Sequence, residues 1–150
     1  MQELGFNYRI TDFQCALGLS QLKKLDKFIQ RRREIVKIYN QELSKIDEII
    51  LPKEKPYVKS SWHIYYIRLK DASKRKRVFE KLRKKGIGVQ VHYIPIHLQP
   101  YYRENLGYKE GDYPKAENYY KSTITLPLFV NLNEKQIKYI INKVKETING

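Results

Sequence analysis

The N-terminal third of the sequence carries a long helical pattern, and this pattern constrains the fold more than any other feature. Apolar residues recur at helical spacing from Phe13 to Leu43, and lysines and arginines fill many of the positions between them. Thr11 and Gln14 have the spacing of a capping box, T-x-x-Q, so we expect the helix to begin after Thr11. A helix much longer than about 25 residues is unusual in a globular domain, so we expect a bend or break near residues 25–27.

The segment before this helix places groups that bind anions. Asn7 and Arg9 come just before the expected N-terminus, whose free amide groups and dipole favour a negative charge. The guanidinium of Arg9 can donate two parallel hydrogen bonds to a phosphate or a carboxylate. The alternative interpretation is a surface turn held by Asn7, and the spacing alone leaves both open.

The rest of the sequence predicts further strands and helices. The expected strands, rich in aromatic and β-branched residues, cover residues 62–69, 89–93 and 123–126. The expected helices cover residues 74–85, residues 114–121 and a final stretch capped by Asn133. This order predicts an α+β fold, with a sheet of about three antiparallel strands and helices on one face, and residues 1–150 as a single domain.

A second candidate site follows the strand expected at residues 89–93. The sequence there reads Gln90-x-His92-Tyr93, followed by Pro95 and His97. In a strand Gln90 and His92 share one face, and loops after strand ends often carry binding groups. The two histidines can act as acid, base or hydrogen-bond donor. The alternative is that they are only polar aromatic residues at a strand end. A metal site is not expected, because a third ligand of the usual kind is missing.

The charge balance points to anionic partners without choosing among them. With 30 basic and 16 acidic residues the net charge is 30 − 16 = +14, which attracts nucleic acid, anionic membranes or phosphorylated small molecules. Residues 74–85 are strongly basic and the chain has 13 tyrosines, but the sequence lacks an RNA-binding motif with the expected spacing. A solvated helix face is therefore the preferred interpretation, and nucleic acid is not an expected partner.

Cysteine and hydropathy indicate the compartment. The single cysteine, Cys15, excludes an internal disulfide and a cysteine-based zinc site, which fits the cytoplasm. Its apolar neighbours predict a packed thiol rather than a nucleophile. The sequence contains no apolar run of about 18–20 residues, so we expect no membrane span.

Three segments resemble one known family. They are LGFNYRITDFQCALGLSQLKKLDKFIQRRREI, GIGVQVHYIPIHLQPYY and TLPLFVNLNEKQIKYII, in this order. Each resembles part of the sugar-nucleotide aminotransferases of the DegT/DnrJ/EryC1/StrS family. Within the family, MQELGFNYR and VQVHYIPIH look most like the members that act in pseudaminic acid biosynthesis.

The resemblance implies a homodimeric fold type I aminotransferase with a large cofactor domain and a small C-terminal domain. Members bind pyridoxal 5'-phosphate through a lysine of the large domain and transfer an amino group from glutamate to a 4-keto sugar nucleotide, here a UDP-sugar. This chain begins where the family is already past that lysine. We therefore expect residues 1–150 to be the C-terminal domain, without the covalently bound cofactor, and to be inactive alone.

The resemblance also implies roles for the two candidate sites. Asn7 is similar to the family residue that contacts the cofactor phosphate of the neighbouring subunit, and Arg9 lies close to the same pocket. The second segment resembles the part that approaches the sugar nucleotide, which suggests His92, Tyr93 and His97 as substrate-binding residues. No catalytic residue is expected in this chain.

Two other classes of function compete with this one. The first is a stand-alone basic module that binds nucleic acid or an acidic partner. The second is an interaction domain that dimerises through the first helix, at Phe28 and Ile35. The order of the family-like segments favours the aminotransferase.

Overall fold

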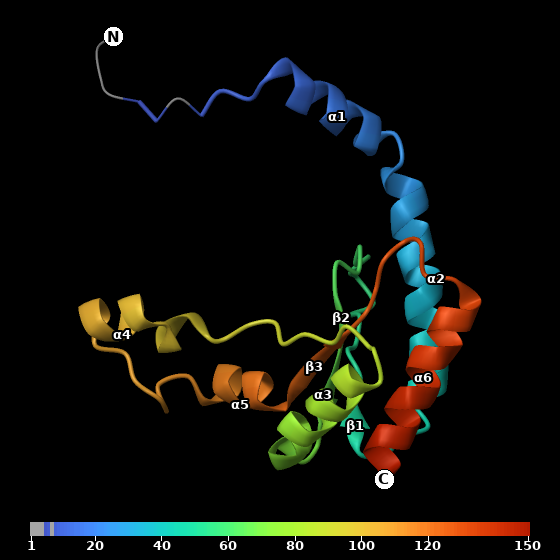
Figure 1. The fold of residues 1–150 in the computed structure, drawn as a ribbon. Coiled ribbons are helices and arrows are strands. Elements are labelled where there is room, and N and C mark those ends of the chain that lie inside the picture. The colour runs from blue at the N-terminus through green and yellow to red at the C-terminus, as the bar shows by residue number, and fades with distance from the viewer. Residues whose placement is uncertain (1–4, 7) are drawn as a thin grey trace.

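The computed structural model describes residues 5–6 and 8–150, and it has the expected α+β architecture (Figure 1). The helices in this part of the chain are α1 (Asp12–Leu22), α2 (Leu25–Leu43), α3 (Arg75–Lys84), α4 (Pro100–Leu106), α5 (Pro114–Ser122) and α6 (Glu134–Asn149). The strands are β1 (Ile49–Ile50), β2 (Tyr65–Leu69) and β3 (Thr123–Leu126), and short 3-10 turns lie at η1 (Ala72–Lys74) and η2 (Ile96–Leu98).

The three strands form one antiparallel sheet in the order β1-β2-β3. Tyr65 pairs with Leu126 and Ile67 with Ile124, so these four side chains share one face of the sheet. The hydrophobic core lies between this face and the helices α2, α3 and α6. The predicted arrangement of three strands with helices on one face is therefore confirmed for the main core.

The second face of the sheet is also covered in part. The ring of Tyr119 on α5 packs edge-on against Tyr66, with ring centroids 5.3 Å apart, and Arg68 Nε donates to Ser122 Oγ at 3.0 Å. All four residues of β3 are buried as a result. In Figure 1, α4 and α5 project from the sheet on the side opposite α2 and α6.

Two strand predictions need correction. The strand expected at residues 62–69 begins only at Tyr65, because Trp62 has a φ of 49°, which an extended strand does not allow. The segment 89–93 is not a strand, and in it Gln90 alone forms a β-bridge, to Thr125 of β3. The pairing does not continue from Gln90 back to Gly88. The residue of the neighbouring strand that would face Gly88 is Pro127, which has no amide hydrogen to donate. The third strand of the sheet is β1 instead.

Two buried tyrosines anchor α2 to the sheet. Tyr39 on α2 donates from its hydroxyl to the carbonyl of Pro127 at 2.8 Å, and Tyr65 donates to Asn40 Oδ1 at 2.8 Å. Burial raises the pKa of both phenols well above the ordinary value. Both remain neutral hydrogen-bond donors at physiological pH.

The first helix begins where the sequence predicts, but its residues do not pack as predicted. The capping box is present, since Gln14 N donates to Thr11 Oγ1 and Thr11 N donates to Gln14 Oε1. The break comes after Leu22, slightly earlier than expected. Every residue of α1 is exposed, Cys15 included, so the predicted packing of this thiol does not occur within the described chain.

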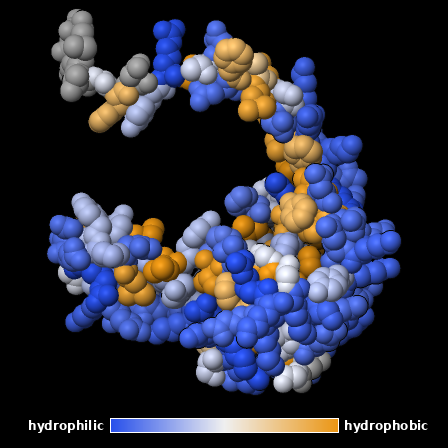
Figure 2. Space-filling view, viewed as in Figure 1, coloured by the Kyte–Doolittle hydropathy of each residue, from blue (hydrophilic) through white to orange (hydrophobic). Residues whose placement is uncertain are grey.

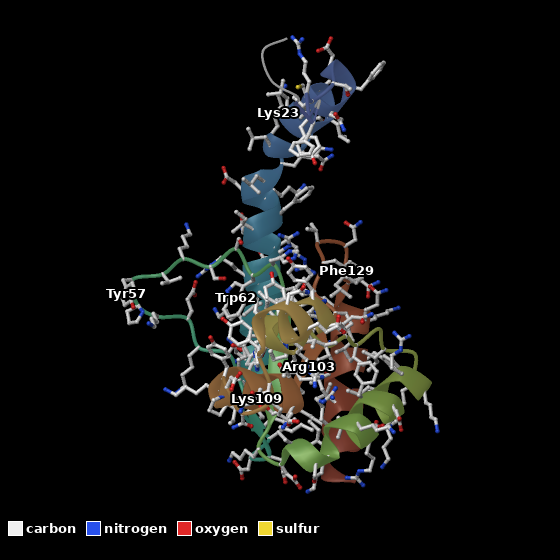
Figure 3. The ribbon with its side chains drawn as sticks, turned by 90° about the vertical axis from the view of Figure 1, so that its left-hand side faces the viewer. Lys23, Tyr57, Trp62, Arg103, Lys109 and Phe129 are labelled. Carbon is white, nitrogen blue, oxygen red and sulfur yellow. The ribbon has the colours of Figure 1, made fainter. Side chains whose placement is uncertain are left out.

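The N-terminal arm, which comprises α1 and the described residues before it, extends away from the body of the molecule. Figure 3 shows Lys23, at the junction of α1 and α2, far from the sheet, whereas Trp62 lies in the body. Ile35 of α2, by contrast, is fully buried in the core. A charged substitution at Ile35 would therefore disrupt folding, so it cannot test dimerisation through this helix. Within the described residues, no helix is long and apolar enough to cross a membrane.

Candidate functional site

The segment after Gln90 leaves the sheet at a defined point. The backbone amide of Gln90 donates to the carbonyl of Thr125 at 3.1 Å, and the amide of Thr125 donates back at 2.8 Å. This bridge places the residues that follow Gln90 beside β3, on the edge opposite β2. The bridge to β3 thus determines where the candidate substrate-binding segment, residues 92–97, begins.

His92 is oriented by the same strand. Its Nδ1 lies 3.0 Å from Oγ1 of Thr125, a buried residue of β3. The ring of His92 packs edge-to-face on Tyr93 with centroids 4.6 Å apart. Because Nδ1 faces Thr125, Nε2 is the ring nitrogen available to a ligand. Tyr93 is 67% exposed, so the pair presents one imidazole nitrogen and one phenol outward.

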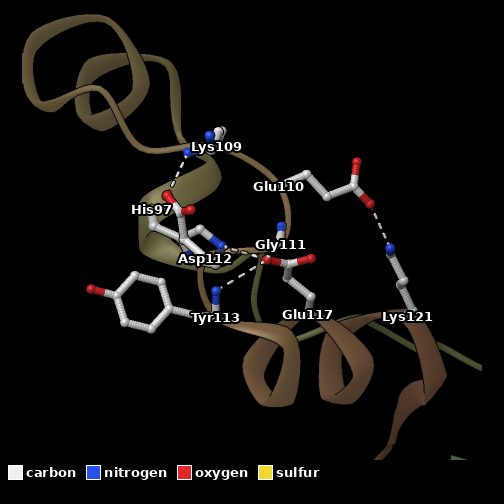
Figure 4. Close-up of polar contacts among 8 residues, drawn as sticks. All are labelled: His97, Lys109, Glu110, Gly111, Asp112, Tyr113, Glu117 and Lys121. Carbon is white, nitrogen blue, oxygen red and sulfur yellow. Dashed lines mark hydrogen bonds and ion pairs between the residues drawn. The ribbon is translucent and has the colours of Figure 1, made fainter.

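His97 has a different environment. It lies in η2, is only 7% exposed, and its Nε2 is 3.0 Å from Oε1 of Glu117 on α5 (Figure 4). The same oxygen accepts from the amides of Gly111 at 2.8 Å and Tyr113 at 3.4 Å. The hydrogen bond from His97 holds the pKa of Glu117 below its ordinary value, and the two amides add to this effect, against the opposing effect of burial.

A small cavity of about 370 Å³ adjoins His97. Its lining is largely aromatic and apolar and includes Tyr102, Tyr108 and Tyr113, of which Tyr113 packs on the imidazole with ring centroids 4.8 Å apart. Larger hollows of about 940 and 630 Å³ lie elsewhere, and their linings include none of the predicted site residues. Of the predicted site residues, His97 lines this small cavity, and His92 and Tyr93 lie in the segment just before it.

The two candidate sites are not brought together within this chain. Asn7 lies outside the described residues, and Arg9 is exposed on the N-terminal arm. Figure 2 shows an open hollow between the arm and the part of the molecule that carries α4 and α5. Apolar side chains are exposed in both parts of the chain, including Phe13 on the arm and Ile96 beside His97.

The lysines of the described residues are placed on the surface of the chain. A lysine that binds an aldehyde cofactor is usually desolvated in a pocket or placed next to another cation, whereas every lysine in the described part of the chain is at least partly exposed. In the same residues, no group of three or more His, Cys, Asp or Glu side chains is arranged to hold a metal ion. The described residues offer groups that can contact an anion, and the absence of the lysine that would hold pyridoxal phosphate covalently stays a prediction.

Comparison with known proteins decides the family. Residues 1–145 match the model of the DegT/DnrJ/EryC1/StrS aminotransferase family. The chain belongs to this family. Over 93% of its length it is 41% identical to the UDP-4-amino-4,6-dideoxy-N-acetyl-beta-L-altrosamine transaminase of Campylobacter jejuni, covering 37% of that protein.

Solved structures of DegT/DnrJ/EryC1/StrS aminotransferases share the fold. The chain superposes on PseC, the Helicobacter pylori aminotransferase of pseudaminic acid biosynthesis, with a TM-score of 0.88 and 32% identity, covering 99% of this chain and 40% of that one. It also superposes on the PLP form of a putative sugar aminotransferase from Streptococcus pneumoniae, with a TM-score of 0.86 and 33% identity, covering 94% and 36%. The family depends on pyridoxal phosphate. The chain spans about two fifths of the length of these relatives.

Sequence reasoning missed two residues that hold the site, Thr125 and Glu117. Thr125 lies in a strand whose residues are all buried, and nothing local marks its hydroxyl as a partner of His92. Glu117 has a weak signal, since it is an acidic residue in the first turn of a helix that begins with Pro114. Its partner His97 is 20 residues away in sequence, so only the fold reveals the contact.

Replacing Thr125 with valine tests how His92 is held. Valine keeps the β-branched shape but removes the hydroxyl, so we expect His92 to lose its preferred tautomer and the chain to lose about 1 kcal/mol of stability. Ring nitrogen chemical shifts of His92 and a urea titration measure the two effects, and Thr125→Ser should restore both. Thr147→Val is the control, since the Thr147 hydroxyl is buried without a partner among the described residues. A tautomer that is unchanged in Thr125→Val would contradict the assignment.

Proposed function

We propose that this chain is the C-terminal part of a pyridoxal-phosphate-dependent aminotransferase that acts on a UDP-linked 4-keto deoxy sugar, with glutamate as amino donor. The observation that carries the proposal is the family match over residues 1–145, together with the 41% identity to the Campylobacter altrosamine transaminase. The product would be an amino sugar for a surface polysaccharide or a flagellin glycan. Family membership favours this function over a stand-alone basic module.

The geometry of the second site supports binding of the sugar nucleotide. His92 is fixed at Nδ1 by Thr125 and presents Nε2, and Tyr93 presents its phenol. Both groups can donate hydrogen bonds to phosphate or sugar oxygens. The net charge of +14 favours the approach of such an anion. Contact of His97 with the substrate stays a prediction, since its Nε2 faces Glu117.

The N-terminal site is proposed to act across a homodimer. Asn7, by the resemblance stated above, would contact the cofactor phosphate of the neighbouring subunit, and Arg9 would lie near the same phosphate. The position of α1 supports this role, because an arm exposed on every side can reach a neighbouring surface. The cofactor, when bound, supplies the electron sink for amino transfer. The residues of this chain would orient the two phosphorylated molecules.

The isolated chain is expected to retain no covalently bound cofactor. After incubation with pyridoxal phosphate, dialysis and borohydride reduction, absorbance and peptide mass spectrometry should show no single lysine labelled at one equivalent per chain. The complete Campylobacter transaminase, treated in parallel, should be labelled at one lysine. Stoichiometric labelling of one lysine in this chain, with a folded circular dichroism spectrum, would contradict the claim that the cofactor lysine lies outside residues 1–150.

A further inference from the structure

The lobe formed by residues 91–121 has an unusual interior. It contains α4, the candidate substrate-binding segment and all of α5 except its last residue, the buried Ser122, and it projects from the sheet. Of its 31 residues (121 − 91 + 1), only His97 and Glu117 are buried, and all the apolar residues are exposed or partly exposed. A lobe without a hydrophobic interior of its own depends on polar contacts to keep one conformation.

Those polar contacts converge on one oxygen atom. Oε1 of Glu117 lies within hydrogen-bond distance of His97 Nε2 at 3.0 Å, the Gly111 amide at 2.8 Å and the Tyr113 amide at 3.4 Å. The donors come from η2, from the loop after α4 and from the residue before α5 (Figure 4). We call this set of contacts the clasp. Hydrogen bonds to an ionised acceptor are about twice as strong as neutral ones.

Two other polar contacts within the lobe are weaker than the clasp. Lys121 pairs with Glu110 at 2.6 Å, and the Lys109 amide donates to Asp112 at 2.9 Å. All four residues are exposed, and exposed ion pairs contribute about 0–1 kcal/mol because water and salt screen them. The clasp is therefore the strongest polar contact within the lobe, and it acts beside the packing of Tyr113 on His97, whose ring centroids are 4.8 Å apart.

The clasp also fixes the far end of the candidate substrate-binding segment. At its start, the segment is held to β3 by the Gln90 bridge and by Thr125. At its end, His97 is held to α5 by Glu117. Pro95, whose ring restricts the backbone, lies between the two attachments. A short segment fixed at both ends presents its exposed side chains in one orientation.

We infer that Glu117 is a positioning residue that holds residues 92–97 in place through His97. The clasp, together with the contact of His92 with Thr125, thus determines the direction in which Tyr93 and Nε2 of His92 face. That these groups face a sugar nucleotide rests on the proposed function. The clasp itself is tested on the free 150-residue chain, without cofactor or substrate, so its failure and the failure of the proposed function are distinguishable.

The test compares Glu117→Ala with Glu110→Gln in the full chain. In Glu117→Ala we expect amide hydrogen exchange at Gly111 to become at least about tenfold faster, and the ring resonances of His92 and Tyr93 to shift. Exchange in β2 and β3 should stay unchanged. Glu110→Gln removes an acidic side chain of the same lobe that lies outside the clasp, and it should change none of these readouts. Glu117→Gln keeps an acceptor oxygen, so it should restore part of the Gly111 protection.

Two results would overturn the inference. One is Gly111 exchange in Glu117→Ala equal to that in Glu110→Gln. The other is unchanged His92 and Tyr93 resonances despite faster exchange, which would show that the clasp holds the lobe but does not position the segment. If Glu117→Ala also loses protection in β2 and β3, Glu117→Gln decides: faster Gly111 exchange together with His92 and Tyr93 resonances that match the unsubstituted chain would overturn the proposal.

Discussion

Replacing Ile124 with alanine is expected to lower the free energy of unfolding by about 2–5 kcal/mol, because the substitution leaves a cavity in a close-packed core. Ile124 is fully buried at the centre of β3, opposite Ile67 of β2. The same strand carries Thr125, which orients His92. Loss of packing at Ile124 should therefore loosen the candidate site as well as the sheet. Urea denaturation followed by circular dichroism measures the loss.

Ile50→Ala is the matched control for this prediction. Ile50 lies in β1 of the same sheet but is 42% exposed, so its truncation should cost about 0.5 kcal/mol or less. Equal losses for the two isoleucines would contradict the assignment of the core to the face of the sheet that carries Ile124.

Amide hydrogen exchange is expected to separate α1 from the rest of the free chain by orders of magnitude. α1 has 11 residues, all exposed, and isolated helices shorter than about 12–15 residues are marginal in water. Its amides should therefore exchange within about tenfold of the unfolded rate, whereas those of β2 and β3 should be protected by about a thousandfold or more. The measurement is residue-resolved exchange at several protein concentrations.

The last helix provides an internal comparison for α1. Both helices begin with a capping box, at Thr11 and at Asn133, but α6 buries an apolar face that includes Ile137 and Val144. Protection of α6 without protection of α1 would show that packing, not capping, decides helix stability here. Protection of α1 equal to that of α6 at every dilution would contradict the prediction. Protection of α1 that appears only at high protein concentration would show that α1 packs against a second copy of the chain.

Local signals in the sequence predicted the helices other than α4, which lies in a segment expected to be irregular. The start at Thr11, the cap at Asn133, the proline-initiated α5 and the end of α3 before Gly86, which has a φ of 75°, are all confirmed. Each depends on side chains and backbone angles within a few residues, so a short sequence window contains the necessary information.

The sheet and the burial pattern were harder to predict, because they depend on distant partners. Nothing near Trp62 shows that its backbone adopts a positive φ, and nothing near Gln90 shows that the strand it faces ends in Pro127. Cys15 was predicted to pack because its neighbours are apolar, yet those neighbours are exposed too. An apolar helix face indicates that something covers it, but the sequence of one chain does not show what does.

In the candidate site, too, the sequence predicts local features but not contacts between distant residues. The pattern of alternating residues placed His92 and Tyr93 in a strand, whereas the structure pairs only Gln90 with β3 and the two residues follow that bridge. The partners that orient the segment, Thr125 and Glu117, come from β3 and α5, 33 and 20 residues away from the histidines that they contact. Only the fold reveals which polar groups meet.

The most direct test of the proposed function is amino-transfer activity of a chimera. In it, this chain replaces the matching 37% of the Campylobacter altrosamine transaminase, to which it is 41% identical. We expect a folded protein that binds pyridoxal phosphate and transfers an amino group from glutamate to the sugar nucleotide of the parent enzyme. The same exchange made with the corresponding segment of the Helicobacter pylori transaminase controls for the junction. A chimera that folds and binds the cofactor but transfers no amino group, while the control is active, would contradict the proposed function.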